Sequence, residues 1–207
     1  MPRRKTVYLA GPEVFLSDAV AVGEAKKAIC ARHGLSGLFP LDNELDLGGL
    51  DPRDAGRAIS AANEALMRRA DLIIANITPF RGPGMDPGTA FEIGFMRALG
   101  RPVFCYTASD LLHAERAVRW AGPAVQERKG EGLEDADGLL IESFGMVENL
   151  MIDGAVEASG GIIVTPDTAA DPQLDLRDLT LFESCVRAAA AAHVGAKAPR
   201  GVQGATG

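Results

Sequence analysis

The sequence predicts a single α/β domain built on a mostly parallel, five-stranded, doubly wound sheet. Two observations support this prediction. Segments typical of strands and segments typical of helices alternate along the first half of the chain. The clearest strand, residues 71–77 (D-L-I-I-A-N-I), is almost entirely apolar. A strand that helices cover on both faces needs this composition, so a parallel sheet follows.

Local signals mark most of the individual elements. Gly11 and Pro12 stop the first strand, and Asp51 and Pro52 start a helix as its N-cap and first residue. The expected strands lie at residues 6–10, 38–40, 71–77, 102–106 and 162–165, with a further short strand at 139–141. The expected helices lie at residues 17–32, 51–70, 88–99, 109–120, 149–158 and 176–193. This order is typical of a Rossmann-like or flavodoxin-like fold, whose ligands bind beyond the carboxyl ends of the strands.

Two stretches are expected to lack regular structure. Residues 122–138 are charged and are predicted to form a loop. Residues 194–207 contain mostly small residues and are predicted to be a disordered tail, so the domain is expected to span residues 1–193.

Composition excludes several partners. The 207 residues carry 21 Lys and Arg against 28 Asp and Glu, a net charge of −7, so polymeric nucleic acid is not an expected partner. No apolar run reaches the roughly 18 residues of a membrane span, and the N-terminus lacks the pattern of a secretory leader. We therefore expect a cytoplasmic protein without a membrane partner.

Motifs for metals and common cofactors are also missing. The three cysteines and three histidines are scattered without ligand spacing, so neither a disulfide framework nor a metal site is expected. No G-x-G-x-x-G follows the first strand, and neither a P-loop nor a G-x-S-x-G motif occurs. The chemistry is therefore assigned to carboxylates, with no cofactor.

Two carboxylates stand where the long loop after residues 71–77 meets the next helix. Asp86 lies in the loop, Glu92 is expected in the first helical turn, and Gly88 lies between them. The topology places this junction at the ligand-binding edge. There the helix dipole favours the ionised carboxylate that a nucleophile requires.

A structural role fits the same residues. Residues 89–92 (T-A-F-E) match the capping box, in which the glutamate accepts from the N-cap amide. Asp86 is then only a solvated loop acid and Gly88 only a turn residue. The substitution Glu92→Gln separates the two roles, because a capping box also accepts Gln whereas a nucleophile loses its activity.

Four motifs in order resemble the nucleoside 2-deoxyribosyltransferase family. They are residues 8–12 (Y-L-A-G-P), 70–76 (A-D-L-I-I-A-N), 78–94 (ending in D-P-G-T-A-F-E-I-G) and 149–151 (N-L-M). The similarity spans about residues 5–160, and the D-x-G-T-A-F-E-x-G block is its most specific part. The resemblance favours a nucleophile at Glu92.

The resemblance implies a reaction and its residues. In that family the glutamate at the position of Glu92 attacks the anomeric carbon of a 2'-deoxyribonucleoside, expels the base and forms a covalent deoxyribosyl ester. A second free nucleobase then takes the sugar, in a retaining double displacement without a metal or organic cofactor. Asp86 is implied to bind the sugar hydroxyls and to place Glu92, and Tyr8 to hydrogen-bond the nucleophile or the sugar.

The resemblance also implies positions that bind substrate. Gly11 and Gly88 are among them, and Phe15 is expected to form an apolar wall for the base, although a core phenylalanine is an equal alternative. Some family members carry an aspartate at the position of Asn63 that protonates the leaving base. An asparagine cannot do so, but its amide can recognise a base edge, with Asp86 or water supplying the proton.

Asn149 and Met151 match family positions that reach the active site of a neighbouring subunit. The resemblance therefore implies a homo-oligomer, a dimer or larger, with shared active sites. Without the resemblance, Asn149 is interpreted as a helix N-cap and Met151 as a core residue.

Two other functions remain open. A hydrolase of the same superfamily hands the sugar to water, and one acting on 5'-monophosphates is expected to bind phosphate near Ser17, Arg81 and residues 12–17. A non-catalytic nucleoside-binding module keeps the pocket without turnover.

Overall fold

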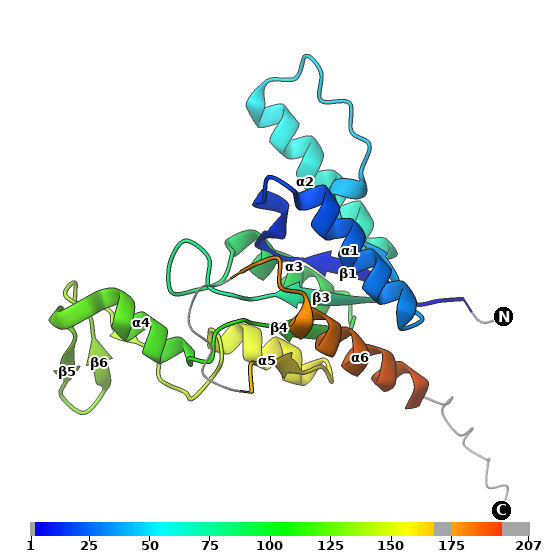
Figure 1. Ribbon diagram of the computed structural model, residues 1–207. Helices are drawn as coiled ribbons and strands as arrows, with labels where there is room; N and C mark the ends of the chain where they lie inside the picture. The colour runs from blue at the N-terminus through cyan, green and yellow to red at the C-terminus, as the bar shows by residue number, and fades with distance from the viewer. Residues whose placement is uncertain (1–2, 168–174, 196–207) are drawn as a thin grey trace, which may run out of the picture.

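The apolar segments after Asp71 and Pro102 form neighbouring strands of a five-stranded parallel sheet in the computed structural model, which describes residues 3–167 and 175–195. The strand order is β2-β1-β3-β4-β8 (Figure 1). The strands are β1 (Thr6–Ala10), β2 (Ser36–Leu38), β3 (Leu72–Asn76), β4 (Val103–Tyr106) and β8 (Ile163–Val164). The predicted doubly wound α/β fold is confirmed, with the flavodoxin-like order of strands.

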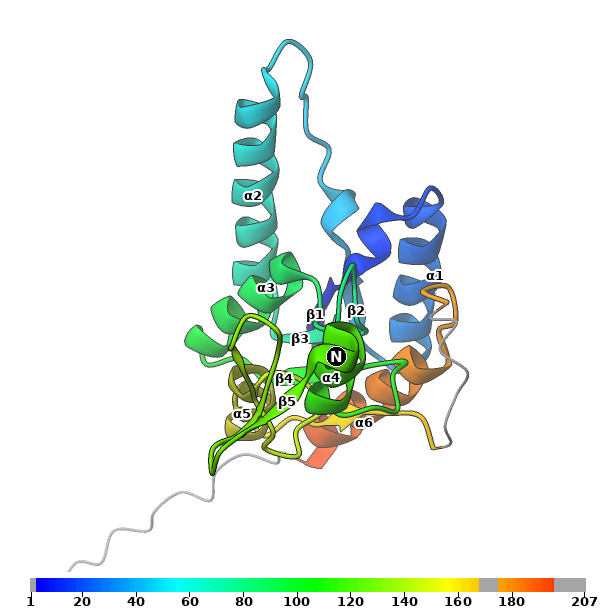
Figure 2. The ribbon, with the colours of Figure 1, turned by 90° about the vertical axis from the view of Figure 1, so that its left-hand side faces the viewer.

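Helices cover both faces of the sheet, as the all-apolar strands require. On one face, the side chains of β1, β3 and β4 pack with α1 (Ala19–Arg32) and α6 (Thr180–Gly195). On the other face they pack with α2 (Pro52–Arg69), α3 (Pro87–Ala98) and α5 (Leu150–Ala158). Only the end of α2, at Leu66 and Met67, enters this core. The rest of α2 rises beyond the sheet (Figure 2), where it can form one side of a site at the sheet edge.

A separate arm interrupts the main fold between β4 and α5. It consists of α4 (His113–Ala121) and a small antiparallel sheet of β5 (Gln126–Arg128), β6 (Gly132–Glu134) and β7 (Leu140–Ile141), and it projects to one side in Figure 1. The prediction of a loop over residues 122–138 was therefore wrong. The charged side chains of β5 and β6 lack the apolar pattern by which strands are predicted. Glu134 on β6 contacts Gln126 and Arg128 on β5, and these cross-strand contacts help to pair the two strands.

Several boundaries differ from those predicted. The second strand ends at Leu38, because Pro40 starts a 3-10 helix, η2 (Pro40–Asp42), in which Asp42 accepts from the amide of Phe39. Residues 109–112 are not helical, and α4 begins at His113. The last helix begins at Thr180 and continues to Gly195. It therefore includes the first two residues of the predicted tail, and residues 196–207 lie outside the described part.

Within the described ranges, no helix has both the length and the apolar character needed to span a bilayer. In the same ranges, His, Cys, Asp and Glu side chains form no group of three or more that can hold a metal ion. Cys30, Cys105 and Cys185 are all buried and free.

A buried ion pair fixes the turn that follows β1. Glu13 lies in the 3-10 helix η1 (Pro12–Phe15), and its Oε1 accepts from Lys26 Nζ at 2.7 Å. The same oxygen accepts from Tyr106 at 2.7 Å and from Asn76 at 3.0 Å. Burial raises the pKa of Glu13, but the charge and hydrogen bond of Lys26 and the bonds from Tyr106 and Asn76 outweigh it and hold the pKa below its usual value. One carboxylate thus joins η1 to α1 and to the ends of β3 and β4.

We expect Lys26→Met to lower the free energy of unfolding by about 3–5 kcal/mol, because it leaves the Glu13 carboxylate buried without its charge partner. Chemical denaturation measures this loss. The double variant Lys26→Met/Glu13→Gln removes both charges and is expected to recover much of it. Arg177→Met, which breaks an exposed pair with Asp18, is the matched control. Equal effects of Lys26→Met and Arg177→Met would contradict the expectation.

Candidate active site

A pocket of about 330 Å³ lies beyond the carboxyl ends of β1 and β3, with part of α2 on one side and the start of α3 on another. This is the edge at which ligands bind in doubly wound folds, and the volume is within the range of small-molecule sites. Six of the nine predicted site residues line it: Gly11, Phe15, Asn63, Asp86, Gly88 and Glu92. Its other lining residues, which the sequence did not single out, are Val14, Pro40, Leu41, Ile59 and Thr89.

Tyr8 orients the Glu92 carboxylate through a hydrogen bond. Its phenol donates to Glu92 Oε1 at 2.5 Å, and Tyr8 itself is fully buried. Burial and the charge of Glu92 raise the pKa of Tyr8, so the phenol stays protonated and remains a donor at neutral pH. The predicted contact between Tyr8 and Glu92 is therefore present in this structure.

Asp86, and not Glu92, serves the start of α3. Asp86 is the N-cap, and its Oδ2 accepts from the Thr89 amide at 2.8 Å and from the Thr89 hydroxyl at 3.0 Å. The capping-box interpretation of Glu92 was therefore wrong. Asp86 is also buried, with 8 % of its surface exposed, so it is not a solvated loop acid either. Because α3 begins at Pro87, Glu92 lies in the second helical turn. The prediction that Glu92 lies in the first turn was therefore wrong.

The protonation of Glu92 differs from the expectation based on the helix dipole. Burial raises the pKa of Glu92 to about 7, the hydrogen bond from Tyr8 opposes this rise, and the charge of Asp86 adds to it. The loss of solvation exceeds the favourable effect of a helix N-terminus, which is typically 0.3–1 kcal/mol and falls off beyond the first turn. Near neutral pH the carboxylate is thus poised between its two protonation states.

Two glycines allow the chain to form the pocket wall. Gly11 has φ +151°, and a Cβ there would overlap Glu13 Oε2 and lie 2.7 Å from Asn76 Cβ. A Cβ on Gly88 would lie 3.0 Å from Asp86 Oδ2, which is tighter than ordinary packing. Side chains at these two positions would displace the groups that shape the pocket.

Phe15 forms a wall of the pocket and is not a core residue. It is 56 % exposed, and its ring stacks on Phe80 with centroids 5.2 Å apart. The Arg81 guanidinium lies over both rings, 5.3 Å from the centroid of Phe15 and 4.6 Å from that of Phe80. Neither Arg81 nor Ser17 lines the pocket, whereas Val14 and Phe15, from the segment 12–17 that was also considered for a phosphate, do line it.

Asn149 and Met151 do not line this pocket in the single chain. Asn149 is the N-cap of α5, as its sequence context predicted, and it accepts from the Met151 amide at 3.0 Å. The Met151 side chain is 70 % exposed, so the interpretation of Met151 as a core residue was wrong. Within one chain, these two residues do not join the other seven.

Comparisons with known proteins identify the family of this chain. The family model described as nucleoside 2-deoxyribosyltransferase matches residues 7–151, which hold all nine predicted site residues. This chain belongs to the nucleoside 2-deoxyribosyltransferase family. It is 36 % identical over 168 residues to an uncharacterized protein of Schizosaccharomyces pombe, covering 76 % of this chain and 79 % of that protein.

A solved structure shows the same similarity. The 2-deoxyribosyltransferase from Leishmania mexicana superposes with a TM-score of 0.55 at 32 % identity, covering 72 % of this chain and 85 % of that one. Both the fold and the family of the present chain are thus nucleoside 2-deoxyribosyltransferase-like.

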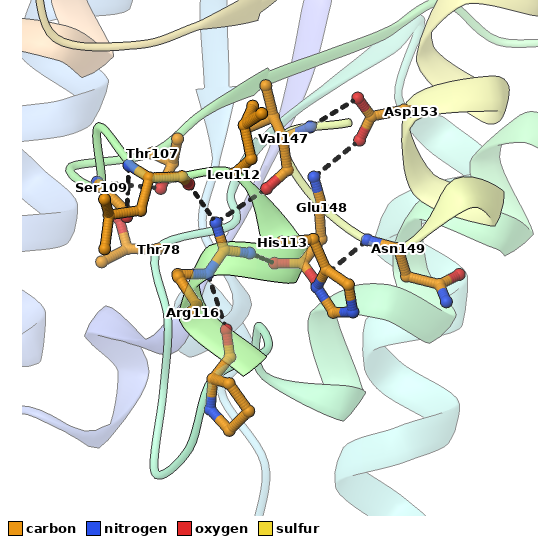
Figure 3. A network of polar contacts seen from close by, with 12 residues as sticks. Thr78, Thr107, Ser109, Leu112, His113, Arg116, Val147, Glu148, Asn149 and Asp153 are labelled. Atoms are coloured by element: carbon orange, nitrogen blue, oxygen red, sulfur yellow. Dashed lines mark hydrogen bonds and ion pairs between the residues drawn. The ribbon is translucent and has the colours of Figure 1, made fainter. Parts of the chain in front are cut away.

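A buried arginine connects the loop before α3 to the segment before α5 in this nucleoside 2-deoxyribosyltransferase homologue. Arg116 on α4 is 7 % exposed, and Figure 3 shows its guanidinium at the centre of a polar network. Its Nε donates to the Pro83 carbonyl at 2.7 Å, and its Nη1 donates to the carbonyls of Leu111 and Val147. Its Nη2 donates to Glu148 at 2.6 Å. The loop that ends at the pocket is thereby tied to the start of α5.

The same network orients the segment that leads into α5. Asp153 accepts from the backbone amides of Val147 and Glu148, and the Asn149 side chain donates to Glu142 at 2.8 Å. Nothing in the sequence pattern pointed to this arrangement, because three of the four acceptors of Arg116 are backbone carbonyls that no motif records.

The raised pKa of Glu92 makes stability depend on pH. The pKa of the Glu92 carboxyl is higher in the folded state, about 7, than its ordinary value of 4.5. Its contribution to the stability of the fold is therefore fully present below about pH 4.5 and is lost as the pH rises through about 7. We expect the protein to lose about 3 kcal/mol relative to Glu92→Gln across this interval. Denaturation at a series of pH values measures the difference.

Two further variants check the causes of this shift. Tyr8→Phe removes the hydrogen bond that lowers the pKa of Glu92, so the loss is expected to extend above pH 7. Asp86→Asn removes the neighbouring charge and is expected to shift the loss to lower pH. A stability difference that stays flat between pH 4 and 8 would contradict the assignment.

Proposed function

We propose that this chain is an N-deoxyribosyltransferase that exchanges nucleobases between 2'-deoxyribonucleosides through a covalent ester on Glu92. One observation carries the proposal. The Glu92 carboxylate lines the pocket, where Tyr8 holds it and Asp86 adjoins it, and it takes no part in capping α3. A buried glutamate in this setting costs stability, which is typical of a functional group.

The composition of the pocket suits a nucleoside. Phe15, Leu41 and Ile59 offer apolar surface for a flat base, and Asn63 offers an amide for its polar edge. Asp86 and Glu92 offer carboxylate oxygens for the sugar. Since Oδ2 of Asp86 is occupied by Thr89, its other oxygen is the one proposed to accept from a sugar hydroxyl.

The proposed reaction has two displacements. In the first, an oxygen of Glu92 forms a bond to the anomeric carbon, and the bond from that carbon to the base nitrogen breaks, with its electron pair passing to the base. In the second, a ring nitrogen of the incoming base forms a bond to the same carbon, the ester bond to Glu92 breaks and restores the carboxylate, and the N–H proton of that nitrogen passes to water. Two inversions give net retention of configuration. The leaving base takes its proton from water, since Asn63 has none to give and Asp86 acts here as an ionised acceptor.

The Tyr8 phenol supports both steps. As a donor to Glu92 it favours the ionised carboxylate and keeps one oxygen oriented. When the ester forms, that carboxylate loses its charge, and the phenol remains as a fixed dipole beside it. No proton needs to leave Tyr8, whose raised pKa opposes ionisation.

We further propose that the active enzyme is a homo-oligomer in which Asn149 and Met151 complete a neighbour's pocket. Large apolar side chains are exposed along one stretch of the chain before and in α5: Leu139, Leu140, Phe144 and Met151. Such a concentration of exposed apolar surface is typical of an interface.

We expect the protein to convert a 2'-deoxyribonucleoside and a second free base into a new deoxyribonucleoside, as separated by chromatography. Glu92→Gln is expected to lower the rate at least about 10³-fold while the fold is kept. Glu24→Gln, which changes an exposed carboxylate on α1, is the control and is expected to retain the rate.

The same assay distinguishes the other functions. Free deoxyribose as the only product, with a second base present, would contradict base exchange and indicate a hydrolase. A melting temperature raised by deoxyribonucleoside without any cleavage would indicate a binding module.

A mixing experiment tests the shared site. Glu92→Gln and Asn149→Ala are each expected to be inactive alone. In a mixed dimer, one of the two pockets combines an intact Glu92 with an intact Asn149, so re-associated mixtures are expected to recover about a quarter of the original activity. Activity measured against sedimentation checks this result, and a fully active monomer would contradict it.

A further inference from the structure

Two asparagines form an amide pair at the side of the pocket. Asn63 lines the pocket from α2, and Asn43 directly follows η2 (Pro40–Asp42). Asn43 Nδ2 donates to the backbone carbonyl of Pro40 at 3.1 Å and to Asn63 Oδ1 at 3.3 Å. One side chain therefore links the two elements that flank this part of the pocket.

The backbone carbonyl decides which way both amides point. A carbonyl oxygen only accepts, so Asn43 must turn its NH₂ group toward Pro40. The same NH₂ group faces Asn63, and therefore Asn63 must present its oxygen to Asn43. The NH₂ group of Asn63 is then directed elsewhere. It has no protein acceptor among residues 3–167 and 175–195, and it is not sealed from solvent.

We propose that Asn43 is a positioning residue that fixes the Asn63 amide as a hydrogen-bond donor toward the base. The inference rests on the proposed function, because it takes the ligand to be a nucleobase. The bases selected are those with an acceptor on the edge that faces α2, either an unprotonated ring nitrogen or an exocyclic oxygen. An amide free to turn over would accept donors and acceptors alike, whereas a fixed amide discriminates between them.

A fixed donor also suits the departure of the base. When the bond to the anomeric carbon breaks, its electron pair passes to the base, and an N–H group already directed at the base stabilises the growing negative charge. Asn63 keeps its proton throughout this step. The amide therefore aids the leaving group by hydrogen bonding, without the proton transfer that an acid at this position would perform.

Calorimetric binding of free bases tests the donor without any turnover. The probes are hypoxanthine, its 3-deaza and 7-deaza analogues, in which a ring acceptor becomes C–H, and adenine, in which an amino group replaces the 6-oxo group. We expect at least one of these replacements to weaken binding to the unchanged protein about tenfold. The base preference is the ratio of the affinities for hypoxanthine and for the most weakened probe. In Asn63→Leu this ratio is expected to fall to about twofold or less.

Variants at Asn43 test the positioning role. Asn43→Ala releases the Asn63 amide, and the preference is expected to fall toward that of Asn63→Leu, with little change in the binding of the disfavoured probe. Asn43→Asp offers only acceptors to Asn63, so it is expected to turn the amide over and reverse the preference. Asn63→Asp also presents an acceptor to the base, and its reversal is expected even if Asn43 variants fold poorly. Asp46→Ala, in the same loop, is the control and is expected to retain the preference.

Three results would overturn the proposal: equal binding of all four probes, no binding of any probe, or a full preference retained in Asn43→Ala. The outcome is separable from that of the proposed function. Base selection by Asn63 without any sugar transfer would contradict the transferase alone, and sugar transfer without base selection would contradict this inference alone.

Discussion

The side chain of Asp86 accepts a hydrogen bond from the backbone amide of Thr89 at the start of α3, and the rest of the site depends on this bond. The first amides of a helix need acceptors, and a carboxylate that meets this need is not free for chemistry. Here one oxygen of Asp86 accepts from both polar groups of Thr89, while Glu92 lies one turn further along and contacts Tyr8. Asp86 and Glu92 both line the pocket, but Asp86 caps α3 whereas Glu92 accepts a hydrogen bond from Tyr8.

The sheet and its polar supports place these acids. Ala10 pairs with Ala75 in adjacent parallel strands, so the turn after β1 and the loop after β3 leave the sheet side by side. Glu13 and Lys26 hold the first of these segments, and Arg116 holds the second through the Pro83 carbonyl. Both anchors are buried charged groups, which are costly unless fully paired. One anchor holds the segment that contains Val14 and Phe15, and the other holds the loop that ends at Asp86, so both support residues that line the pocket.

Much of this structure was predictable from the sequence, for identifiable reasons. The apolar run at β3, and the Asp-Pro pair at the start of α2, each specify one local structure, and both predictions are confirmed. The position of Glu92 at the ligand edge followed from topology. The helical turn in which Glu92 lies and its raised pKa could not be predicted, because they depend on which residue caps α3 and on how deeply the carboxyl is buried. The strands β5 and β6 were missed because their charged side chains mask pairing that only contacts reveal. The amide pair of Asn43 and Asn63 depends on a backbone carbonyl that no sequence pattern records.

The proposed reaction requires Glu92 to be the group that bonds to the sugar. The direct measurement is mass spectrometry of the intact protein and its peptides after incubation with a 2'-fluoro-2'-deoxyribonucleoside, whose fluorine on the sugar slows the breakdown of a glycosyl ester. The account predicts one added fluorodeoxyribosyl group per chain, located on Glu92 and removed by a free nucleobase. An adduct on another residue, or base release from this analogue without any adduct, would contradict it.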